Sequence, residues 1–492
     1  MISLRPGRRE RPSDGGRADE LPLEHPPAPL VTLANRLPVA KTRNGWRTAD
    51  GGLVSALRPT LETRPASWVG WDGGASDVPH TLPDLGARLV PIALKKQQVE
   101  NYYHGFSNRT LWPLFHSLAD RVVIDRRWWR DYCDVNDRFA ERALEVAAPN
   151  ALLWIHDYQL LCVPAQLRRA GEGRPMGFFL HIPFPPAELF ARLPWRDHLV
   201  DGLLGADVVA FQTEEFRQNF VRTCLRLKEG LTVDGPRLRL PDGRFVLTAT
   251  HPISIDAKAM RLQARQSDVH GALERLRKQF ADRRVLVGVD RLDYTKGIVE
   301  RLRAIELLLE RRREFRGRLA VLQIAVPSRG DIREYRDLRA EVEQVVGRIN
   351  GRFTRPGQDV PVHYLYRGVS ADRLLAHYGV ADVCLVTPLR DGMNLVCKEF
   401  VTCQEAVGGS GVLLLSEFAG AAEELREALP CNPFDVEGLS GNIELALELD
   451  EDDRLWRIER LAERVRKHDV FAWLDQEVGT LEAVAAAAGP SG

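Results

Sequence analysis

The 492-residue sequence has few cysteines and no long apolar run. Its seven cysteines are scattered and form no C-x-x-C pair, which disfavours both a disulfide framework and a zinc ribbon. No apolar stretch approaches the roughly 20 residues that span a bilayer. The charged N-terminus also lacks the apolar segment of a secretory signal. These absences predict a cytoplasmic protein with reduced thiols and no membrane partner.

An excess of charge of one sign is also absent. Lysine and arginine total 68, aspartate and glutamate total 68, and the formal net charge is zero. This balance argues against a nucleic-acid partner, but it is compatible with a local basic cleft for a small phosphate. The hydrophobic fraction of 44% is typical of a globular protein, and the length favours two sizeable domains.

Short, continuously apolar segments alternate with longer helical patterns along the chain. Apolar runs without polar alternation suit strands covered on both faces, as in parallel sheets. The predicted strands are 30–34, 151–155, 177–181, 207–211, 285–289, 319–325, 361–365, 382–387 and 412–416. Helical patterns intervene, for example at 299–315 and 332–349. We therefore predict an α/β protein with two doubly wound, Rossmann-like domains facing a cleft.

Composition and pattern divide the chain into five predicted parts. Residues 1–28 are rich in Arg, Pro, Gly and acids, so they are predicted to form a disordered tail. An N-terminal Rossmann-like domain is predicted over 29–252 and a C-terminal one over 253–468. A last helix over 469–483 is predicted to return to the first domain, and 484–492 to be a flexible tail. Ligands of such sheets bind beyond the carboxyl ends of the strands, so the chemistry is expected there.

The segment VLVGVDRLDYTKG (285–297) runs from a buried strand into a loop and then a helix. Arg291 and Lys296 lie in this loop, beside a helix N-terminus whose free N–H groups favour anions. Two cations there can hold a diphosphate and stabilise it as a leaving group. Lysine is scarce in the chain, at nine residues, which favours a role for Lys296. The alternative is a solvated loop with incidental charges.

A second strand-end segment, DVCLVTPLRDGMNLVCKE (382–399), carries a turn followed by a helix. Backbone N–H groups of Gly392, Met393 and Asn394 are predicted to face an anion, and Asp391 to face sugar hydroxyls. Glu399, further into the helix, is predicted to accept both hydroxyls of a ribose. An acid that only caps the helix is the alternative for Asp391.

Three further segments carry weaker signals. Gly51-Gly52 opens a helical run, but no ATP P-loop or dinucleotide fingerprint surrounds it. His156-Asp157-Tyr158 and His181 each end a strand, and no serine-hydrolase or zinc-protease motif accompanies them, so structural histidines are the alternative. Tyr103 and Trp112 lie in the aromatic, polar stretch 101–116, which suits either a core or a sugar-phosphate wall.

Together these segments resemble glycosyltransferase family 20. The resemblance runs from about residue 30 to about residue 474. It rests on ten motifs in order, namely ANRLPV, GGLVSAL, YYHGFSNRTLWPLFH, WIHDYQLL, GFFLHIPFP, VDRLDYTKGI, PSRGDIREY, GRINGRF, TPLRDGMNLVCKEF and SEFAGAAEEL. It implies the GT-B architecture, and a retaining transfer of glucose from a nucleoside-diphosphate glucose to glucose 6-phosphate. The implied products are α,α-trehalose 6-phosphate and the nucleoside diphosphate.

The resemblance also assigns residues. The acceptor pocket for glucose 6-phosphate is implied to consist of Arg36, Tyr103, Trp112, Asp157 and Arg329. Donor contacts are implied for Gly52, His181, Arg291, Lys296, Asp391, Gly392, Met393, Asn394, Leu395 and Glu399. Arg291, Lys296, His181 and Asp391 are the expected catalytic residues, in a front-face mechanism without metal or cofactor. Homo-oligomers, as dimers or tetramers, are also implied.

The sequence departs from the family pattern in a few places. Gln159 stands where many relatives have His, Ala34 where Ser is common and Asp290 where Glu is frequent. The region 364–370 differs from relatives that use UDP-glucose, so UDP, ADP and GDP all stay open as the donor nucleotide.

Other functions also stay open. Within the family they are a glucosylglycerol-phosphate synthase and a pseudo-glycosyltransferase that joins cyclitols. From other classes they are a catalytically silent regulatory subunit and a hydrolysing nucleotide-sugar epimerase.

Overall fold

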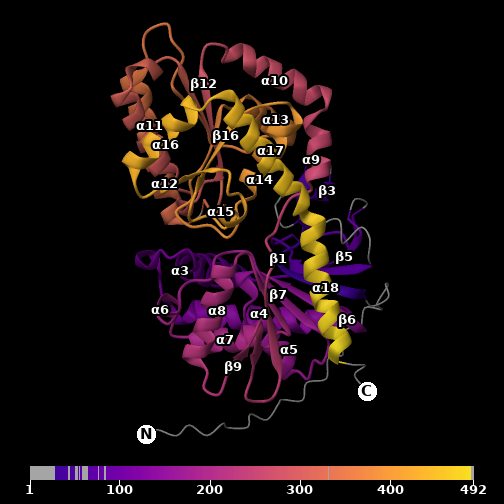
Figure 1. Cartoon of the computed structure of the whole chain (residues 1–492). Coiled ribbons are helices and arrows are strands. Elements are labelled where there is room, and N and C mark those ends of the chain that lie inside the picture. The colour runs from indigo at the N-terminus through magenta and orange to yellow at the C-terminus, as the bar shows by residue number, and fades with distance from the viewer. Residues whose placement is uncertain are drawn as a thin grey trace.

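Two parallel β-sheets, one above the other, organise the chain (Figure 1). The computed structural model describes residues 28–42, 45–49, 54, 56–57, 65–75, 77–82, 85–330 and 332–488. Of the predicted N-terminal tail, 1–27 lie outside these residues, and β1 begins at residue 28. Gly51 and Gly52 lie outside them as well.

The first half of the chain forms a nine-stranded sheet in the order β5-β4-β1-β6-β7-β8-β11-β10-β9. Its pairs are parallel except for β10 with β9 and with β11. The strands are β1 (Ala28–Arg36), β4 (Ala66–Trp71), β5 (Ala87–Ile92), β6 (Ala147–His156), β7 (Met176–Leu180), β8 (Val208–Phe211), β9 (Thr232–Asp234), β10 (Arg237–Arg239) and β11 (Phe245–Thr250). A separate antiparallel hairpin pairs β2 (Val39–Thr42) with β3 (Gly45–Thr48).

Helices cover this first sheet, and several of them have a side-chain N-cap. They are α2 (Lys96–Gln98), the π-helix η1 (Val99–Leu111), α3 (Trp112–Phe115), η2 (Ala119–Arg121), α4 (Arg126–Val146), η3 (Tyr158–Leu160), α5 (Val163–Arg169), α6 (Ala187–Phe190), α7 (Arg196–Leu204) and α8 (Glu214–Leu227). The backbone N–H of Arg127 donates to the Asp125 carboxylate over 2.7 Å at the start of α4. Such side-chain caps satisfy N–H groups that a helix leaves unpaired.

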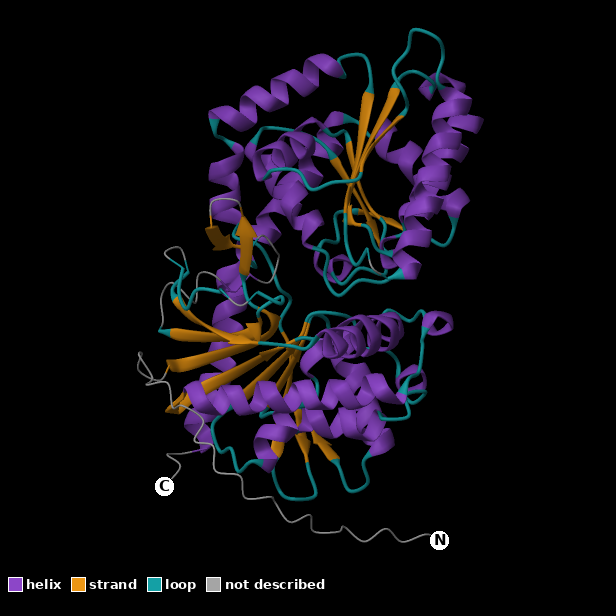
Figure 2. Cartoon of the chain, turned by 180° about the vertical axis from the view of Figure 1, so that it is seen from behind, coloured by secondary structure: helices purple, strands orange, loops and turns teal. Residues whose placement is uncertain are grey.

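The second half forms a six-stranded parallel sheet in the order β14-β13-β12-β15-β16-β17. Its strands are β12 (Arg284–Arg291), β13 (Leu319–Val326), β14 (Val362–Leu365), β15 (Val383–Val386), β16 (Val412–Ser416) and β17 (Leu429–Cys431). Its helices are α9 (Ala257–Ala264), α10 (Ser267–Gln279), η4 (Tyr294–Lys296), α11 (Ile298–Arg311), η5 (Arg313–Phe315), α12 (Arg333–Phe353), α13 (Ala371–Val380), α14 (Leu395–Ala406), α15 (Ala421–Glu424), α16 (Val436–Glu448), α17 (Glu451–Lys467) and α18 (Val470–Ala488). Figure 2 shows helices on both sides of these strands.

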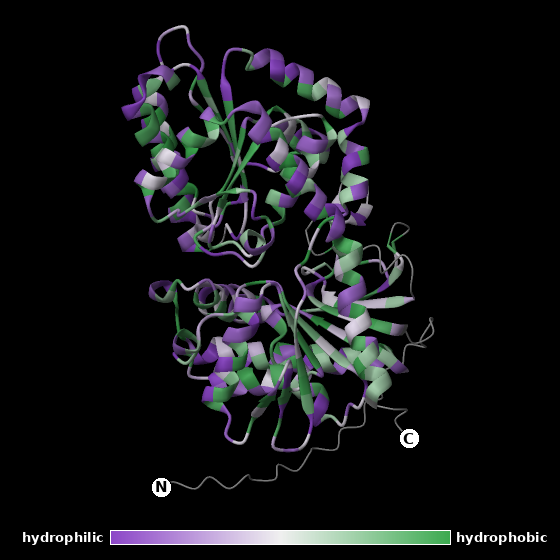
Figure 3. Cartoon of the chain, in the orientation of Figure 1, coloured by the Kyte–Doolittle hydropathy of each residue, from purple (hydrophilic) through white to green (hydrophobic). Residues whose placement is uncertain are grey.

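The predicted α/β class with two Rossmann-like sheets is confirmed. Every predicted strand occurs. Most are apolar runs buried on both faces, such as β16, which is buried throughout, whereas the edge strand β14 is only partly buried. Figure 3 shows hydrophobic residues concentrated on the strands of both sheets. The pattern did not predict β4, β5, β11, β17 or the two hairpin regions. Several of these strands are short or carry residues such as Pro, Gly and Arg that interrupt an apolar run.

The last helix, α18, runs alongside the first sheet, whereas α17 lies with the second (Figure 1). The Trp473 ring lies 5.6 Å from Trp154 of β6 and 5.4 Å from Phe179 of β7, measured between ring centroids. The helix extends to Ala488 and so includes residues that the sequence predicted as tail. Among the described residues, no helix has both the length and the apolar character needed to cross a membrane.

Candidate active site

Arg291 is the last residue of β12, an inner strand of the second sheet, and Lys296 ends the short helix η4 that follows; the sequence had predicted both in a loop. Asp293 shapes the segment between them, because its carboxylate accepts from the backbone N–H of Thr295 over 3.1 Å. Gly297 then has a φ of 61°, and a Cβ there would lie 2.1 Å from the Thr387 carbonyl oxygen. Only glycine fits this close approach, which lets α11 start directly behind the two cations.

The turn after β15 brings Asp391 against Lys296, with 2.5 Å between Nζ and Oδ2. The Asp391 carboxylate also accepts from the Gly392 backbone N–H over 2.9 Å and from the Asn394 amide over 3.0 Å. Burial raises the pKa of Asp391, but the charge and hydrogen bond of Lys296, together with His116 and Asn394, outweigh burial and hold the pKa below its usual value. The N-cap of α14 is Asn394, so the alternative that Asp391 only caps this helix is wrong.

A cavity of about 330 Å³ lies between the two sheets at these loops. It is lined by His181, Gln212, Ile253, Val289, Asp290, Arg291, Lys296, Asp391, Met393, Asn394, Leu395, Val396 and Glu399. We call it the donor cavity. All but two of the predicted donor contacts line it; Gly52 lies outside the described residues, and Gly392 packs behind His181. A Cβ on Gly392 would lie 2.1 Å from the His181 carbonyl oxygen, so the two halves touch here.

Glu399 lies on α14 at the end of the donor cavity. Its Oε2 accepts from the Tyr378 hydroxyl over 2.9 Å, and burial raises the pKa of its carboxyl group. The other carboxyl oxygen of Glu399, Oε1, is therefore left for another partner. The predicted contact with a ribose needs such an oxygen.

In the first half, the ends of β6 and β7 place His156, Asp157 and His181 together. The His181 backbone N–H donates to Asp157 over 3.3 Å, and Asp157 has a positive φ of 75°. Burial raises the pKa of Asp157 to about 6, against the opposing effects of two backbone hydrogen bonds and the charges of Arg291 and Arg329. Asp157 lines a second cavity, which lies in the first half of the chain.

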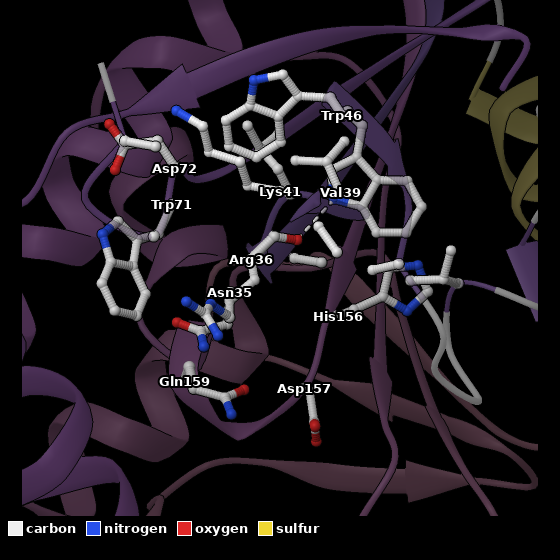
Figure 4. Close-up of a pocket in the computed structure, with 18 residues that line it drawn as sticks. Asn35, Arg36, Val39, Lys41, Trp46, Trp71, Asp72, His156, Asp157 and Gln159 are labelled. Carbon is white, nitrogen blue, oxygen red and sulfur yellow. Dashed lines mark hydrogen bonds between the residues drawn. The ribbon is translucent and has the colours of Figure 1, made fainter. Parts of the chain in front are cut away.

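That second cavity, of about 570 Å³, lies at the end of β1 and beside the hairpin. We call it the acceptor cavity. Figure 4 shows Arg36, Trp71 and Gln159 on one side of it and His156 and Asp157 on the other. The Arg36 guanidinium lies 4.6 Å over the Trp71 ring, and Tyr103 lies 5.9 Å from Trp71. Arg36 and Asp157 thus line this cavity, whereas Tyr103 does not line it and lies against Trp71, which does.

Trp112 and Arg329, the remaining predicted acceptor residues, also line neither cavity. They lie in a buried cluster between the halves, with the Arg329 guanidinium 4.1 Å over the Trp112 ring. Arg329 donates to the Tyr158 hydroxyl over 3.1 Å and to Asp293 over 3.2 Å, and it also contacts the Tyr335 hydroxyl.

Asp293 is the centre of this cluster, and the sequence analysis missed it. Its carboxylate is fully buried and accepts from the Trp112 indole over 3.4 Å and from the Tyr335 hydroxyl over 3.0 Å. Burial raises the pKa of Asp293, but the charges of Arg329 and Arg291 outweigh it and lower the pKa to about 2. Its place between two candidate cations in DRLDYTKG is the one sequence signal that pointed to it.

Comparison with known proteins identifies the family. The profile of glycosyltransferase family 20 matches residues 29–483. The chain belongs to glycosyltransferase family 20.

Similar proteins support this placement in family 20. A trehalose-6-phosphate synthase of Mycolicibacterium smegmatis is 44% identical over 457 residues, which covers 90% of each chain. A UDP-forming α,α-trehalose-phosphate synthase of Burkholderia xenovorans, in complex with glucose-6-phosphate, is 34% identical with a TM-score of 0.84, and covers 92% of this chain and 99% of that one. An E. coli structure bound with UDP-2-fluoro glucose has the same identity and TM-score, over 92% and 98%. The two facing sheets therefore form the GT-B architecture of family 20 synthases.

Proposed function

We propose that this family 20 enzyme transfers glucose from a nucleoside-diphosphate glucose to glucose 6-phosphate, giving α,α-trehalose 6-phosphate and the nucleoside diphosphate. One observation carries the proposal: Arg291 and Lys296 of the second half share a cavity with His181 of the first half. The 44% identity to a trehalose-6-phosphate synthase over 90% of the chain supports the same reaction. The division into an acceptor-side domain, 29–252, and a donor-side domain, 253–468, with the helix 469–483 crossing back, is part of this proposal.

In the proposed complex the donor diphosphate lies against Arg291, Lys296 and the turn 392–395. The guanidinium of Arg291 has no hydrogen bond or ion pair with any described residue, so its donors are available to an anion. Lys296 is held by Asp391, which aims the ammonium group into the cavity. Asp391 and His181 are then placed for hydroxyls of the transferred glucose, and Glu399 for the ribose diol.

The chemistry needs orientation and charge stabilisation. The bond between the glucose anomeric carbon and the departing phosphate oxygen breaks, and a bond to the anomeric hydroxyl oxygen of glucose 6-phosphate forms on the same face. The hydroxyl proton passes to the departing phosphate oxygen, so the configuration is retained. Arg291 and Lys296 stabilise the negative charge that develops on the diphosphate, because cations placed in advance in a dry cavity need little reorganisation.

The acceptor is proposed to bind at the acceptor cavity, with its phosphate toward Arg36, Tyr103 and Arg329. Trp112 is proposed to lie between the two substrates, and the Arg291 guanidinium lies 5.6 Å from its ring. Asp157 is placed for an acceptor hydroxyl. The Burkholderia xenovorans relative, which was solved with glucose-6-phosphate, supports this class of acceptor.

Incubation of the purified chain with glucose 6-phosphate and each of UDP-, ADP- and GDP-glucose tests the proposal. Nucleoside diphosphate is expected to appear only when the acceptor is present, with trehalose 6-phosphate as the second product. UDP-glucose is the first donor to test, because a relative is UDP-forming. Release without dependence on the acceptor contradicts the proposal, and glucosylation of glycerol 3-phosphate in preference to glucose 6-phosphate identifies the glucosylglycerol-phosphate alternative.

The charged residues of the donor cavity argue against a catalytically silent regulatory subunit. Such a subunit is expected to lose the charged groups that stabilise a leaving group, whereas Arg291, Lys296 and Asp391 all line the donor cavity. Absence of transfer with all three donors is the result that restores this alternative.

A further inference from the structure

Two histidines at adjacent strand ends form a hydrogen-bonded pair behind the donor cavity. His156 ends β6, and His181 follows the neighbouring strand β7. Nδ1 of His156 lies 3.1 Å from Nε2 of His181. His181 lines the donor cavity, and His156, which has no exposed surface, lies at the wall of the acceptor cavity. The contact therefore links a residue of the donor cavity to a buried residue at the wall of the acceptor cavity.

Aromatic side chains enclose the pair and keep it neutral. The Trp154 ring lies 4.4 Å from His156, and the Phe179 ring lies 4.5 Å from His181. Trp473, from α18, lies 6.4 Å from His181. Burial lowers the pKa of both histidines, that of His181 to about 3, so each ring carries a single N–H. One nitrogen of the contact must then donate and the other accept.

The other ring nitrogen of His156, Nε2, decides which histidine donates the hydrogen bond and which accepts it. Nε2 of His156 is buried and has no partner among the described residues. If His181 were the donor, His156 would carry its proton on Nε2 and bury an N–H without an acceptor. If His156 is the donor, its Nε2 only leaves a lone pair unused. Buried N–H groups without a partner are rarer in proteins than acceptors left incompletely used, so the second arrangement is favoured.

The direction of this bond sets the tautomer of His181. When Nε2 of His181 accepts, its proton resides on Nδ1. Nδ1 has no partner among the described residues and is not a buried atom, so it is the ring nitrogen open to the cavity that His181 lines. An N–H at this place can donate to a hydroxyl oxygen of a sugar.

We propose that His156 is a positioning residue: it donates its Nδ1 proton to Nε2 of His181 and keeps His181 as the Nδ1–H tautomer, which donates to a hydroxyl oxygen of the donor sugar. The role in sugar binding rests on the proposed function, but the tautomer does not. Trp154 and Trp473 contribute by excluding water that would otherwise compete for the histidine nitrogens.

The tautomer can be read directly by ¹⁵N nuclear magnetic resonance of the intact, histidine-labelled chain without substrates. Long-range nitrogen–proton correlations distinguish protonated from unprotonated ring nitrogens, and the spectra of His156→Asn and His181→Gln assign the two residues. Protonation of Nδ1 in both rings is the expected result. Protonation of His181 on Nε2 overturns the proposal, whatever the activity of the protein.

A matched pair of variants tests the function of the contact. Asn and Leu have nearly the same shape, but only Asn presents an N–H close to the place of Nδ1. His156→Leu is expected to lower kcat by about tenfold, the loss of one buried hydrogen bond, and His156→Asn by less than about threefold. Equal losses in the two variants overturn the positioning role.

Two controls keep these outcomes separate. Thermal unfolding of both variants shows whether a loss of activity follows from a loss of folded protein, and the Leu variant is compared only at temperatures where it is folded. If the wild-type chain shows no transfer with any donor, the proposed function fails, and the resonance experiment alone judges the His156 proposal.

Discussion

The proposed donor and acceptor sites hold their arginines, Arg291 and Arg329, in different ways. On the donor side, Arg291 has no ion pair or hydrogen bond with the described residues and only lies over the Trp112 ring. On the acceptor side, Arg329 is nearly buried and is engaged by Asp293, Tyr158 and Tyr335. One guanidinium is left available for a ligand, and the other is already held by the protein.

This difference indicates two ways of preparing a cation for a phosphate. An unpaired arginine at a cavity wall keeps its full donor capacity, and its charge is neutralised when the anion binds. A buried arginine needs partners to offset the cost of desolvation, and those partners fix its position. Asp293 provides this for Arg329, so the proposed acceptor site is expected to depend on residues that never touch the substrate.

The largest expected effect comes from the donor cations. Arg291→Ala is expected to lower kcat about a hundredfold, since groups that stabilise a developing anion contribute on the order of 3 kcal/mol. Lys296→Ala should lose a similar amount. Steady-state rates measured with saturating glucose 6-phosphate check this.

The two variants should differ in stability. Arg291→Ala removes no ion pair, so its unfolding midpoint should match the wild type. Lys296→Ala leaves the buried Asp391 carboxylate without its cation, and its unfolding midpoint should fall. A folded Lys296→Ala variant with near-normal turnover contradicts the proposed donor site.

Asp293→Asn tests the buried cluster. The variant weakens the hold on Arg329 and Trp112, so kcat/KM for glucose 6-phosphate is expected to fall about tenfold or more, with a smaller change in the KM of the donor. Equal changes for both substrates argue against a specific link to the acceptor side.

Acid unfolding gives a second measurement on the same residue. Because the pKa of Asp293 falls from 3.8 to about 2 on folding, the ionised carboxylate stabilises the native state above pH 3.8. That contribution is lost as the pH falls through about 2. The free energy of unfolding of Asp293→Asn should therefore depend less on pH in this window than that of the wild type.

Asp157→Asn is expected to separate stability from activity. The pKa of Asp157 rises from 3.8 to about 6 on folding, so the native state binds more protons than the unfolded state between these values. Its contribution to stability is present below pH 3.8 and is lost as the pH rises through about 6. The variant should be more stable than the wild type at pH 7.5, by about 1–2 kcal/mol, and less active. Urea unfolding at pH 5 and pH 7.5 checks this; a less stable variant at pH 7.5 contradicts it.

The smallest expected effect concerns an ion pair that joins the halves away from both cavities. Arg109 of η1 and Glu334 of α12 lie 2.8 Å apart, with side chains 36% and 30% exposed. Glu334→Gln should cost less than about 1 kcal/mol of stability, as is usual for exposed pairs, and change kcat less than about twofold. Glu343→Gln, which breaks a pair within α12, is the matched control. A large loss of activity in Glu334→Gln alone shows that this pair controls closure of the cleft.

The sequence predicted the strands that are uninterrupted apolar runs and missed strands whose apolar residues are interrupted by Gly, Arg or Pro. β12 and β16 are uninterrupted apolar runs, and α11 follows a strand and a Gly297 turn. β4 (ASWVGW) and β5 (ARLVPI) mix apolar residues with Gly, Arg or Pro, and their strand character depends on pairing with β1. The cations Arg291 and Lys296 were predicted from their place at the carboxyl end of β12, and the structure puts both in one cavity, where their roles stay a prediction.

What the sequence determined by itself is the continuously apolar strands of both sheets and the polar groups at their carboxyl ends, because both follow from local periodicity and turn residues. The tertiary structure alone decided which of these groups meet. Asp293 lies near Arg329 and Trp112, 36 and 181 residues away in the chain, and His156 lies against His181. Such contacts arise from the packing of one sheet against the other and of neighbouring strands, and no local pattern encodes them.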